Sequence, residues 1–245
     1  MEKNIQPNKG ETLDSIKDIK LFQSEDGYRF SVDALLLENF IAAKRLHEGI
    51  ELGTGSGIIS ILLAKRLPET RITAVELQAS LAERAQRNVD LNGVGGKVKI
   101  LSKDIKALRR VFAANAFDFA FSNPPYRKLK TGRMSISGER AVARHEIEIT
   151  LPEMIKTASY LLKHSGRFYL IYHPFRLTEL VELLRKSRLE PKKMRFVHSS
   201  EGSEAKMVLI EAAKGSGTWL KIDPPLYLYD KGTMYSSEMK QILSS

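Results

Sequence analysis

The sequence predicts an α/β protein built on a seven-stranded, mostly parallel sheet with helices on both faces. Strand-like and helix-like segments alternate along the chain, which is typical of a parallel sheet with crossover helices. The chain has 245 residues, of which 42% are hydrophobic and 28% charged, and this is enough for a substantial core. Since no repeat, linker or low-complexity tract divides it, we expect a single domain over residues 1–245.

The expected elements follow a polar stretch, Met1–Lys20. Alternating and β-branched residues, as in Arg71–Leu77, indicate strands, and Gly93 and Pro68 are typical helix stops. The last thirty residues are expected to form an extended hairpin on the sheet edge. We expect strands at Gly49–Leu52, Arg71–Leu77, Val98–Ser102, Phe117–Phe121, Arg167–Tyr172, Lys192–Val197 and Lys206–Ala212. We expect helices at Val32–Ala43, Ile58–Leu67, Ala79–Asn92, Leu151–Lys163 and Leu177–Ser187.

The composition limits the classes of function. The formal net charge is +10 and the pI about 9.6, which favours a polyanionic partner such as nucleic acid, although general solubility is an alternative reading. The absence of cysteine excludes disulfides, thiolate metal sites and a cysteine nucleophile, and no histidine or carboxylate motif indicates a metal. The polar start and short apolar runs predict neither a signal peptide nor a membrane span, so a cytoplasmic protein is expected.

A glycine-rich loop follows the first strand of the sheet and opens a helix. It contains Glu51, Gly53, Gly55 and Gly57. A dinucleotide-binding loop would need glycine at the position of Ile58, and a phosphate-binding loop would need a final Gly-Lys-Ser/Thr. The spacing Glu-x-Gly-x-Gly-x-Gly is instead similar to the S-adenosyl-L-methionine loop of Rossmann-like methyltransferases. A plain strand–helix turn is the alternative.

Two acidic residues end the next two strands. Glu76 can accept hydrogen bonds from both hydroxyls of a ribose, although a surface glutamate is the alternative. Asp104 can accept from the amino group of an adenine, and a helix N-cap is compatible with the same position. With the neighbouring Leu77 and Ile105, they complete the cofactor site that we expect around the glycine loop.

The tetrapeptide Asn123-Pro124-Pro125-Tyr126 follows the fourth strand, at the edge where α/β sheets bind ligands. An ordinary Asn-Pro turn is the alternative. The Asn123 amide oxygen and the Pro124 carbonyl can both accept from one planar amino group and orient it for methyl transfer without a strong base. Tyr126 can stack on a base held outside its own stack. We therefore expect Asn123, Pro124, Pro125 and Tyr126 to form the catalytic site.

A polar insertion over residues 127–149 follows this motif. Its cations outnumber its acids, so it is the part of the chain that we expect to face nucleic-acid phosphates. The cations are Arg127, Lys128, Lys130, Arg133, Arg140 and Arg144.

These motifs resemble the Asn-Pro-Pro-Tyr amino-methyltransferases, and nearly the whole chain resembles the bacterial tRNA1(Val) (adenine-N6)-methyltransferase family. The resemblance implies a class I S-adenosylmethionine-dependent methyltransferase fold and methylation of adenine at anticodon-loop position 37 of a tRNA. One departure is Arg127, where the family usually has an aromatic residue. The resemblance is carried by Phe22-Gln23, Gly27–Leu37, Glu51–Gly57, Asn123–Tyr126 and Ala143–Glu146.

The same resemblance implies roles for two further segments. The N-terminal segment 1–48 would cover the cofactor, with Tyr28–Asp33 closing over it, although Asp33 is equally compatible with capping a helix. Arg144, His145 and Glu146 would lie near the substrate, and a surface histidine is the alternative for His145. Other interpretations are a protein-glutamine N5-methyltransferase, a DNA adenine or rRNA guanine methyltransferase, and a non-catalytic RNA-binding module.

Overall fold

The computed structural model describes residues 6–26, 31–42, 47–124, 150–230 and 232–244. Within these residues the chain forms a nine-stranded sheet and a separate two-stranded one. The large sheet contains β3 (Glu48–Leu52), β4 (Arg71–Glu76), β5 (Val98–Ser102), β6 (Phe117–Ser122), β7 (Leu162–Tyr172), β8 (Leu189–His198), β9 (Ala205–Lys214), β10 (Lys221–Ile222) and β11 (Leu226–Tyr227). Its order is β10-β8-β9-β7-β6-β3-β4-β5, and β11 also pairs with β8.

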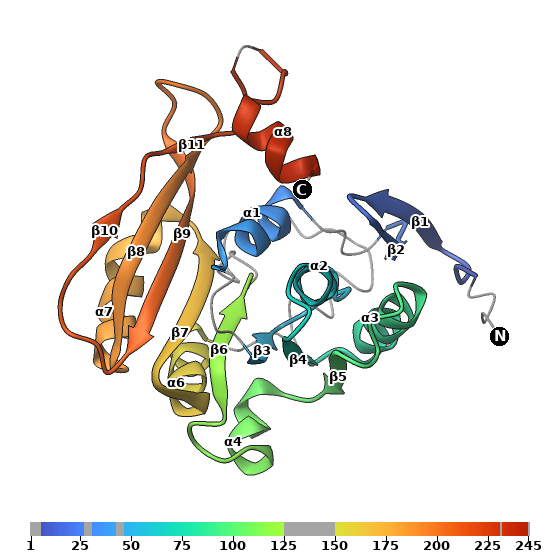
Figure 1. Ribbon diagram of the computed structural model, residues 1–245, viewed down its shortest axis with the longest axis horizontal. Helices are drawn as coiled ribbons and strands as arrows, with labels where there is room; N and C mark the ends of the chain where they lie inside the picture. Colours follow the sequence, from blue (N-terminus) through green and yellow to red (C-terminus); the bar gives the residue numbers. More distant parts are fainter. Residues whose placement is uncertain (1–5, 27–30, 43–46, 125–149, 231, 245) are drawn as a thin grey trace.

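The seven expected strands are all present, as β3 to β9, and they form the body of the sheet (Figure 1). They run parallel except for β9, which is antiparallel to both β7 and β8. The expectation of a mostly parallel sheet is therefore confirmed. The close approach of β3 and β6 depends on Gly49, because a Cβ atom there would lie 2.3 Å from the ring of Phe119.

The sheet is wider than expected because the C-terminal residues add two short strands. The predicted hairpin is wrong: β10 and β11 both pair in parallel with β8, beside Lys193 and Val197 respectively. Pro224 and Pro225 lie between the two short strands, and proline favours an extended chain. The Arg195 side chain donates to the Pro224 carbonyl at 2.9 Å and so helps to hold this segment along β8.

Helices cover both faces of the sheet, as expected (Figure 1). On one face α1 (Val32–Phe40), α2 (Ile58–Arg66), α3 (Ala79–Leu91) and α8 (Ser237–Ser244) pack on one hydrophobic cluster. On the other face α4 (Leu108–Val111), α6 (Leu151–Leu161) and α7 (Leu177–Lys186) pack on a second cluster. Side chains of β7 alternate between the two, with Tyr169 in the first and Phe168 in the second. The sequence reading missed the short helices α4 and α8.

The N-terminal residues form a hairpin that the sequence reading also missed. Strands β1 (Glu11–Ile16) and β2 (Ile19–Ser24) pair antiparallel and lie beside α3. Asn88 of α3 and Asn92 at its C-cap bond to the backbone of β2 in the way that a neighbouring strand would. The amide of Asn92 bonds with both the N–H and the C=O of Lys20, at 3.0 and 2.7 Å. The amide of Asn88 bonds in the same way with Phe22, at 2.7 and 3.2 Å.

Two wider searches covered the described residues only. None of the helices there has the length and apolar character needed to cross a membrane. No cluster of three or more histidine, aspartate or glutamate side chains in this part of the chain is arranged to hold a metal ion.

Candidate active site

The predicted site residues meet at the carboxyl edge of the sheet. Parallel pairing places Leu52 beside Val75 and Glu76 beside Ser102, and it places Glu51 beside Phe121. The loops that follow β3, β4, β5 and β6 therefore leave the sheet side by side. The Ser122 hydroxyl strengthens this arrangement by donating to the Leu52 carbonyl at 2.6 Å, which ties the end of β6 to the start of the glycine loop.

The glycine loop has a backbone that few other residues adopt. Gly53, Gly55 and Gly57 have φ angles of +82°, +58° and +88°. The N–H groups of Gly53 and Thr54 both donate to the Val75 carbonyl, at 3.0 and 2.9 Å, so the loop is fixed to β4. Gly57 is the N-cap of α2 and provides no side-chain cap for the first turn of this helix. Among the described residues, no heavy atom lies within 4 Å of a Cβ built on Gly53, so this part of the loop borders open space.

Glu51 supports the loop from beneath. Its side chain is fully buried, and one carboxyl oxygen accepts hydrogen bonds from the hydroxyls of Thr54, at 2.5 Å, and Ser60. Burial raises the pKa of Glu51 to about 8, and the nearby Glu76 carboxylate adds to the rise while the two hydroxyl bonds oppose it. The structure thus gives Glu51 a role in holding the loop, whereas direct contact with a cofactor stays a prediction.

Glu76 ends β4 and faces the same loop. One of its carboxylate oxygens accepts from the Gly55 N–H at 2.9 Å and the other from the Gln78 N–H at 3.0 Å. Burial raises the pKa of Glu76, whereas these backbone hydrogen bonds lower it. A carboxylate oxygen has a second lone pair, so Glu76 can still accept from hydroxyl groups of a ligand. The surface-glutamate alternative is excluded, because the residue is only 7% exposed.

The other residues expected to bind the cofactor differ in burial and in hydrogen bonding. Asp104 caps the short helix η1 (Ile105–Ala107) by accepting from the Lys106 N–H at 2.8 Å, which is the N-cap alternative considered above. Ile105 is buried in the second hydrophobic cluster, and Leu77 is half-buried. Asp33 lies in the first turn of α1, but the N-cap there is Ser31, so the capping alternative for Asp33 is wrong. A carboxylate in a first turn is instead stabilised by the helix dipole.

The first half of the tetrapeptide that we predict to be catalytic lies at this edge. Asn123 and Pro124 directly follow β6 and are half-buried. Pro125 and Tyr126 lie outside the described residues, as does the insertion 127–149 with Arg144, His145 and Glu146. The structure therefore brings Asn123 and Pro124 beside the glycine loop.

The sequence reading missed two polar residues beneath the loop. Asn88, fully buried on α3, donates to the Ser56 carbonyl at 2.9 Å while its amide also bonds to Phe22, so it links the loop to the N-terminal hairpin. The Ser56 hydroxyl is buried and has no hydrogen-bond partner among the described residues. Asn88 could have been identified from the sequence, because it lies four residues before Asn92 and therefore on the same, buried face of the predicted helix.

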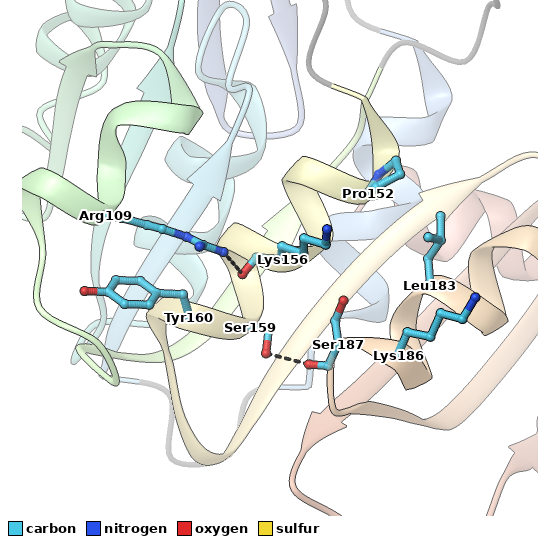
Figure 2. Close-up of a pocket in the computed structure, with 8 residues that line it drawn as sticks. All are labelled: Arg109, Pro152, Lys156, Ser159, Tyr160, Leu183, Lys186 and Ser187. Carbon is cyan, nitrogen blue, oxygen red and sulfur yellow. Dashed lines mark hydrogen bonds between the residues drawn. The ribbon is translucent and has the colours of Figure 1, made fainter.

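A cleft of about 370 Å³ lies apart from this edge, among α4, α6 and α7 (Figure 2). In Figure 2 the Arg109 side chain reaches the Lys156 carbonyl, to which it donates at 3.0 Å. The Arg109 guanidinium also lies 5.3 Å from the centre of the Tyr160 ring. The cleft contains none of the predicted site residues. Its lining is Arg109, Pro152, Lys156, Ser159, Tyr160, Leu183, Lys186 and Ser187.

Comparison with known protein families identifies the family to which this chain belongs. The profile of the methyltransferase small domain family matches residues 31–197, which include the glycine loop, Glu76 and the tetrapeptide. The chain belongs to this family. It is therefore a methyltransferase, as the sequence predicted.

Relatives within the family carry a more specific name. A tRNA1(Val) (adenine(37)-N6)-methyltransferase of Porphyromonas gingivalis is 30% identical over 203 residues, covering 80% of this chain and 79% of the relative. A protein of the same name from Histophilus somni is 28% identical over 232 residues, covering 93% of this chain and 94% of the relative. The resemblance to this group of methyltransferases is confirmed.

Solved structures support the predicted fold. A predicted O-methyltransferase of Agrobacterium tumefaciens superposes with a TM-score of 0.69 at 23% identity, covering 86% of this chain and 94% of that one. A precorrin-6y C5,15-methyltransferase of Geobacter metallireducens superposes with a TM-score of 0.54 at 17% identity, covering 79% and 93%. The Rossmann-like methyltransferase fold is thereby confirmed.

Proposed function

We propose that this methyltransferase transfers the methyl group of S-adenosyl-L-methionine to the exocyclic N6 amino group of adenine 37 in the anticodon loop of a tRNA. The observation that carries the proposal is the position of Asn123 and Pro124 at the end of β6, tied by Ser122 to the glycine loop at the end of β3. The names of the relatives supply the substrate, and the net charge of +10 suits a polyanion.

The residues at the edge fit the proposed cofactor. Glu76 offers a buried carboxylate for the ribose hydroxyls, and Asp104 follows the neighbouring strand, where the adenine of the cofactor would lie. The backbone at Gly53 borders open space, and the buried Ser56 hydroxyl lacks a partner among the described residues, as expected beside a polar ligand. When bound, the cofactor supplies an electrophilic methyl group on a sulfonium centre.

The chain's own groups prepare the amine for attack. The Asn123 side-chain oxygen and the Pro124 carbonyl would accept the two protons of the planar amino group, and Tyr126 would stack on the adenine ring. These contacts would orient the nitrogen without a strong base. The two acceptors stabilise the positive charge that the nitrogen gains as its bond to the methyl carbon replaces the bond from that carbon to the sulfonium sulfur, and the nitrogen then loses a proton to solvent. Positioning and electrostatics would therefore account for most of the catalysis.

The decisive test is methylation of unmodified tRNA1(Val) by the purified protein, followed by nucleoside analysis for N6-methyladenosine. Asn123→Ala removes one acceptor and should lower turnover by roughly 10²–10³-fold while cofactor binding stays unchanged. Tyr126→Phe should keep most of the activity, whereas Tyr126→Ala should weaken RNA binding as well. Methylation of glutamine peptides in place of RNA, or normal turnover of Asn123→Ala, would contradict the proposal.

A further inference from the structure

A pair of stacked rings, His173 and the exposed Phe175, lies beside the proposed catalytic motif. Strand β7 pairs with β6 so that Leu170 is opposite Ser122, and Tyr172 therefore lies about level with Pro124. Directly after Tyr172, the chain turns through His173 into the short helix η2 (Pro174–Arg176). The ring of Phe175 stacks on that of His173, with 5.2 Å between their centres and 25° between their planes.

Phe175 is exposed although the turn that carries it is well anchored. The ring is 75% exposed, which is the highest value among the large hydrophobic side chains of the described residues. His173 is fixed by a contact of 3.0 Å between its Nδ1 and the Lys206 carbonyl of β9. Arg176 donates to the hydroxyl of the buried Tyr172 at 2.5 Å and pairs with Glu179 at 2.8 Å. The fold thus holds an aromatic ring in solvent on a rigid turn.

The place of this pair in the sheet suggests its ligand. The sheet order β9-β7-β6-β3-β4 places the glycine loop on one side of Asn123 and the turn after β7 on the other side. Neighbouring strands are about 4.8 Å apart, so this turn begins about one strand spacing from the catalytic motif. A flat, exposed aromatic surface at this edge is typical of sites that bind unpaired bases of single-stranded nucleic acid.

We propose that Phe175, backed by His173, is a stacking platform for an unpaired nucleobase adjacent to the methylated adenine. The proposal rests on the proposed RNA substrate. An adenine that is methylated on its amino group leaves its stack, so the neighbouring base loses a stacking partner. Phe175 would replace that partner and thereby hold the RNA in register on the side of Asn123 away from the cofactor. The platform is sequence-tolerant, because every base has an aromatic face.

The test combines enzyme variants with RNA variants. Three RNA substrates are compared. One is an unmodified anticodon stem-loop, and each of the other two carries a single abasic nucleotide, either directly before or directly after the target adenine. Phe175→Ala should raise KM for the intact RNA roughly tenfold or more, whereas Phe175→Tyr should keep the KM of the unaltered enzyme. On the RNA that lacks the stacked base, Phe175→Ala should cause no further loss, since the interaction is already absent.

A matched control separates stacking on Phe175 from loss of any exposed aromatic residue. Trp219 is 66% exposed and lies next to β10, away from the catalytic motif, so Trp219→Ala should leave KM unchanged. An unchanged KM in Phe175→Ala would contradict the stacking role of Phe175 but not the proposed function. An equal rise of KM on the intact RNA and on both abasic RNAs would have the same consequence. A failure of the unaltered enzyme to methylate any RNA would overturn the proposed function and the platform with it.

Discussion

Single residues at the carboxyl edge carry charges whose states depend on burial. Glu51 and Glu76 lie close together beneath and beside the glycine loop, and burial raises the pKa of both. Glu76 keeps two backbone N–H donors, which favour its charged form. Glu51 accepts from two hydroxyls and has a pKa of about 8, so its neutral form dominates at neutral pH. The two carboxyl groups therefore serve different purposes, one as loop support and one as the ligand acceptor that we propose.

The raised pKa of Glu51 predicts how stability depends on pH. The unfolded chain releases this proton near the ordinary value of 4.5, whereas the folded chain keeps it to about 8. The folded state therefore binds more protons between these values, and the free energy of unfolding should fall as pH rises through this window. Glu51→Gln mimics the neutral carboxyl and should reduce that slope. Urea unfolding of the cofactor-free protein from pH 5 to 8 measures it.

The control for this experiment is Glu182→Gln, which changes an exposed carboxylate of α7 that pairs with Lys186. This variant should keep the slope of the unaltered protein. An identical slope in Glu51→Gln would show that Glu51 is already ionised in the folded state.

At the scale of elements, the N-terminal hairpin and α3 act together to hold the glycine loop. In β2, the backbone of Lys20 bonds to the Asn92 side chain and that of Phe22 to the Asn88 side chain. Of these two asparagines, Asn88 also bonds to Ser56 in the glycine loop. Buried ion pairs add to the docking, since Glu11 of β1 contacts both Arg84 and Arg87 of α3 at 2.8 and 2.7 Å. The hairpin is thus linked to the glycine loop through the buried side chain of Asn88.

Replacing Asn88 and Asn92 one at a time should distinguish the docking of β2 on α3 from the support of the glycine loop. Asn88→Ala leaves buried backbone groups of Phe22 and Ser56 without partners, so it should lower the free energy of unfolding by about 1–3 kcal/mol. It should also weaken binding of S-adenosylmethionine, which calorimetry measures. Asn92→Ala loosens β2 from α3 without touching the loop, and it should leave cofactor affinity unchanged. Equal effects of both variants on affinity would contradict a specific role of Asn88.

At the scale of the whole molecule, the order of strands arranges the proposed functions along one edge. The glycine loop and Glu76 follow β3 and β4, Asn123 follows β6, and the exposed aromatic pair follows β7. A substrate base would therefore meet the cofactor from the side of β7. The excess of positive charge along the chain, +10 in total, would attract the RNA substrate that we propose.

The salt dependence of RNA binding tests which cations face the RNA. Neutralising Arg127 and Lys128, which follow the tetrapeptide in the sequence, should flatten the plot of log affinity against log salt by about 1–2 units of slope. Cofactor affinity should stay the same. The matched control is neutralisation of Arg71 and Lys186, exposed cations at the opposite, amino edge of the sheet. An equal change of slope in both sets would mean that only net charge matters.

The sequence by itself determined the seven strands in the body of the sheet and the motif residues that follow them at the carboxyl edge. The strands β3 to β9, the glycine loop, Glu76 and Asn123 were all predictable, because alternation, turn residues and motif spacing are local properties of the chain. Parallel strands meet at a common edge, so placing these residues together required only the order of the elements. The extra width of the sheet, the hairpin and the N-cap of α1 did not follow from those rules.

Only the tertiary structure decided the features that depend on distant contacts. Strands β10 and β11 each have two residues and are defined by pairing with β8 rather than by their own pattern. The docking of β2 needs Asn88 and Asn92, more than sixty residues away in the chain, to replace a strand. The exposure of Phe175 depends on how β7 and β9 hold the turn beneath it. The pairing of β10 and β11, the docking of β2 and the exposure of Phe175 all depend on contacts between residues far apart in the chain. The pattern of residues within a local segment therefore does not predict them.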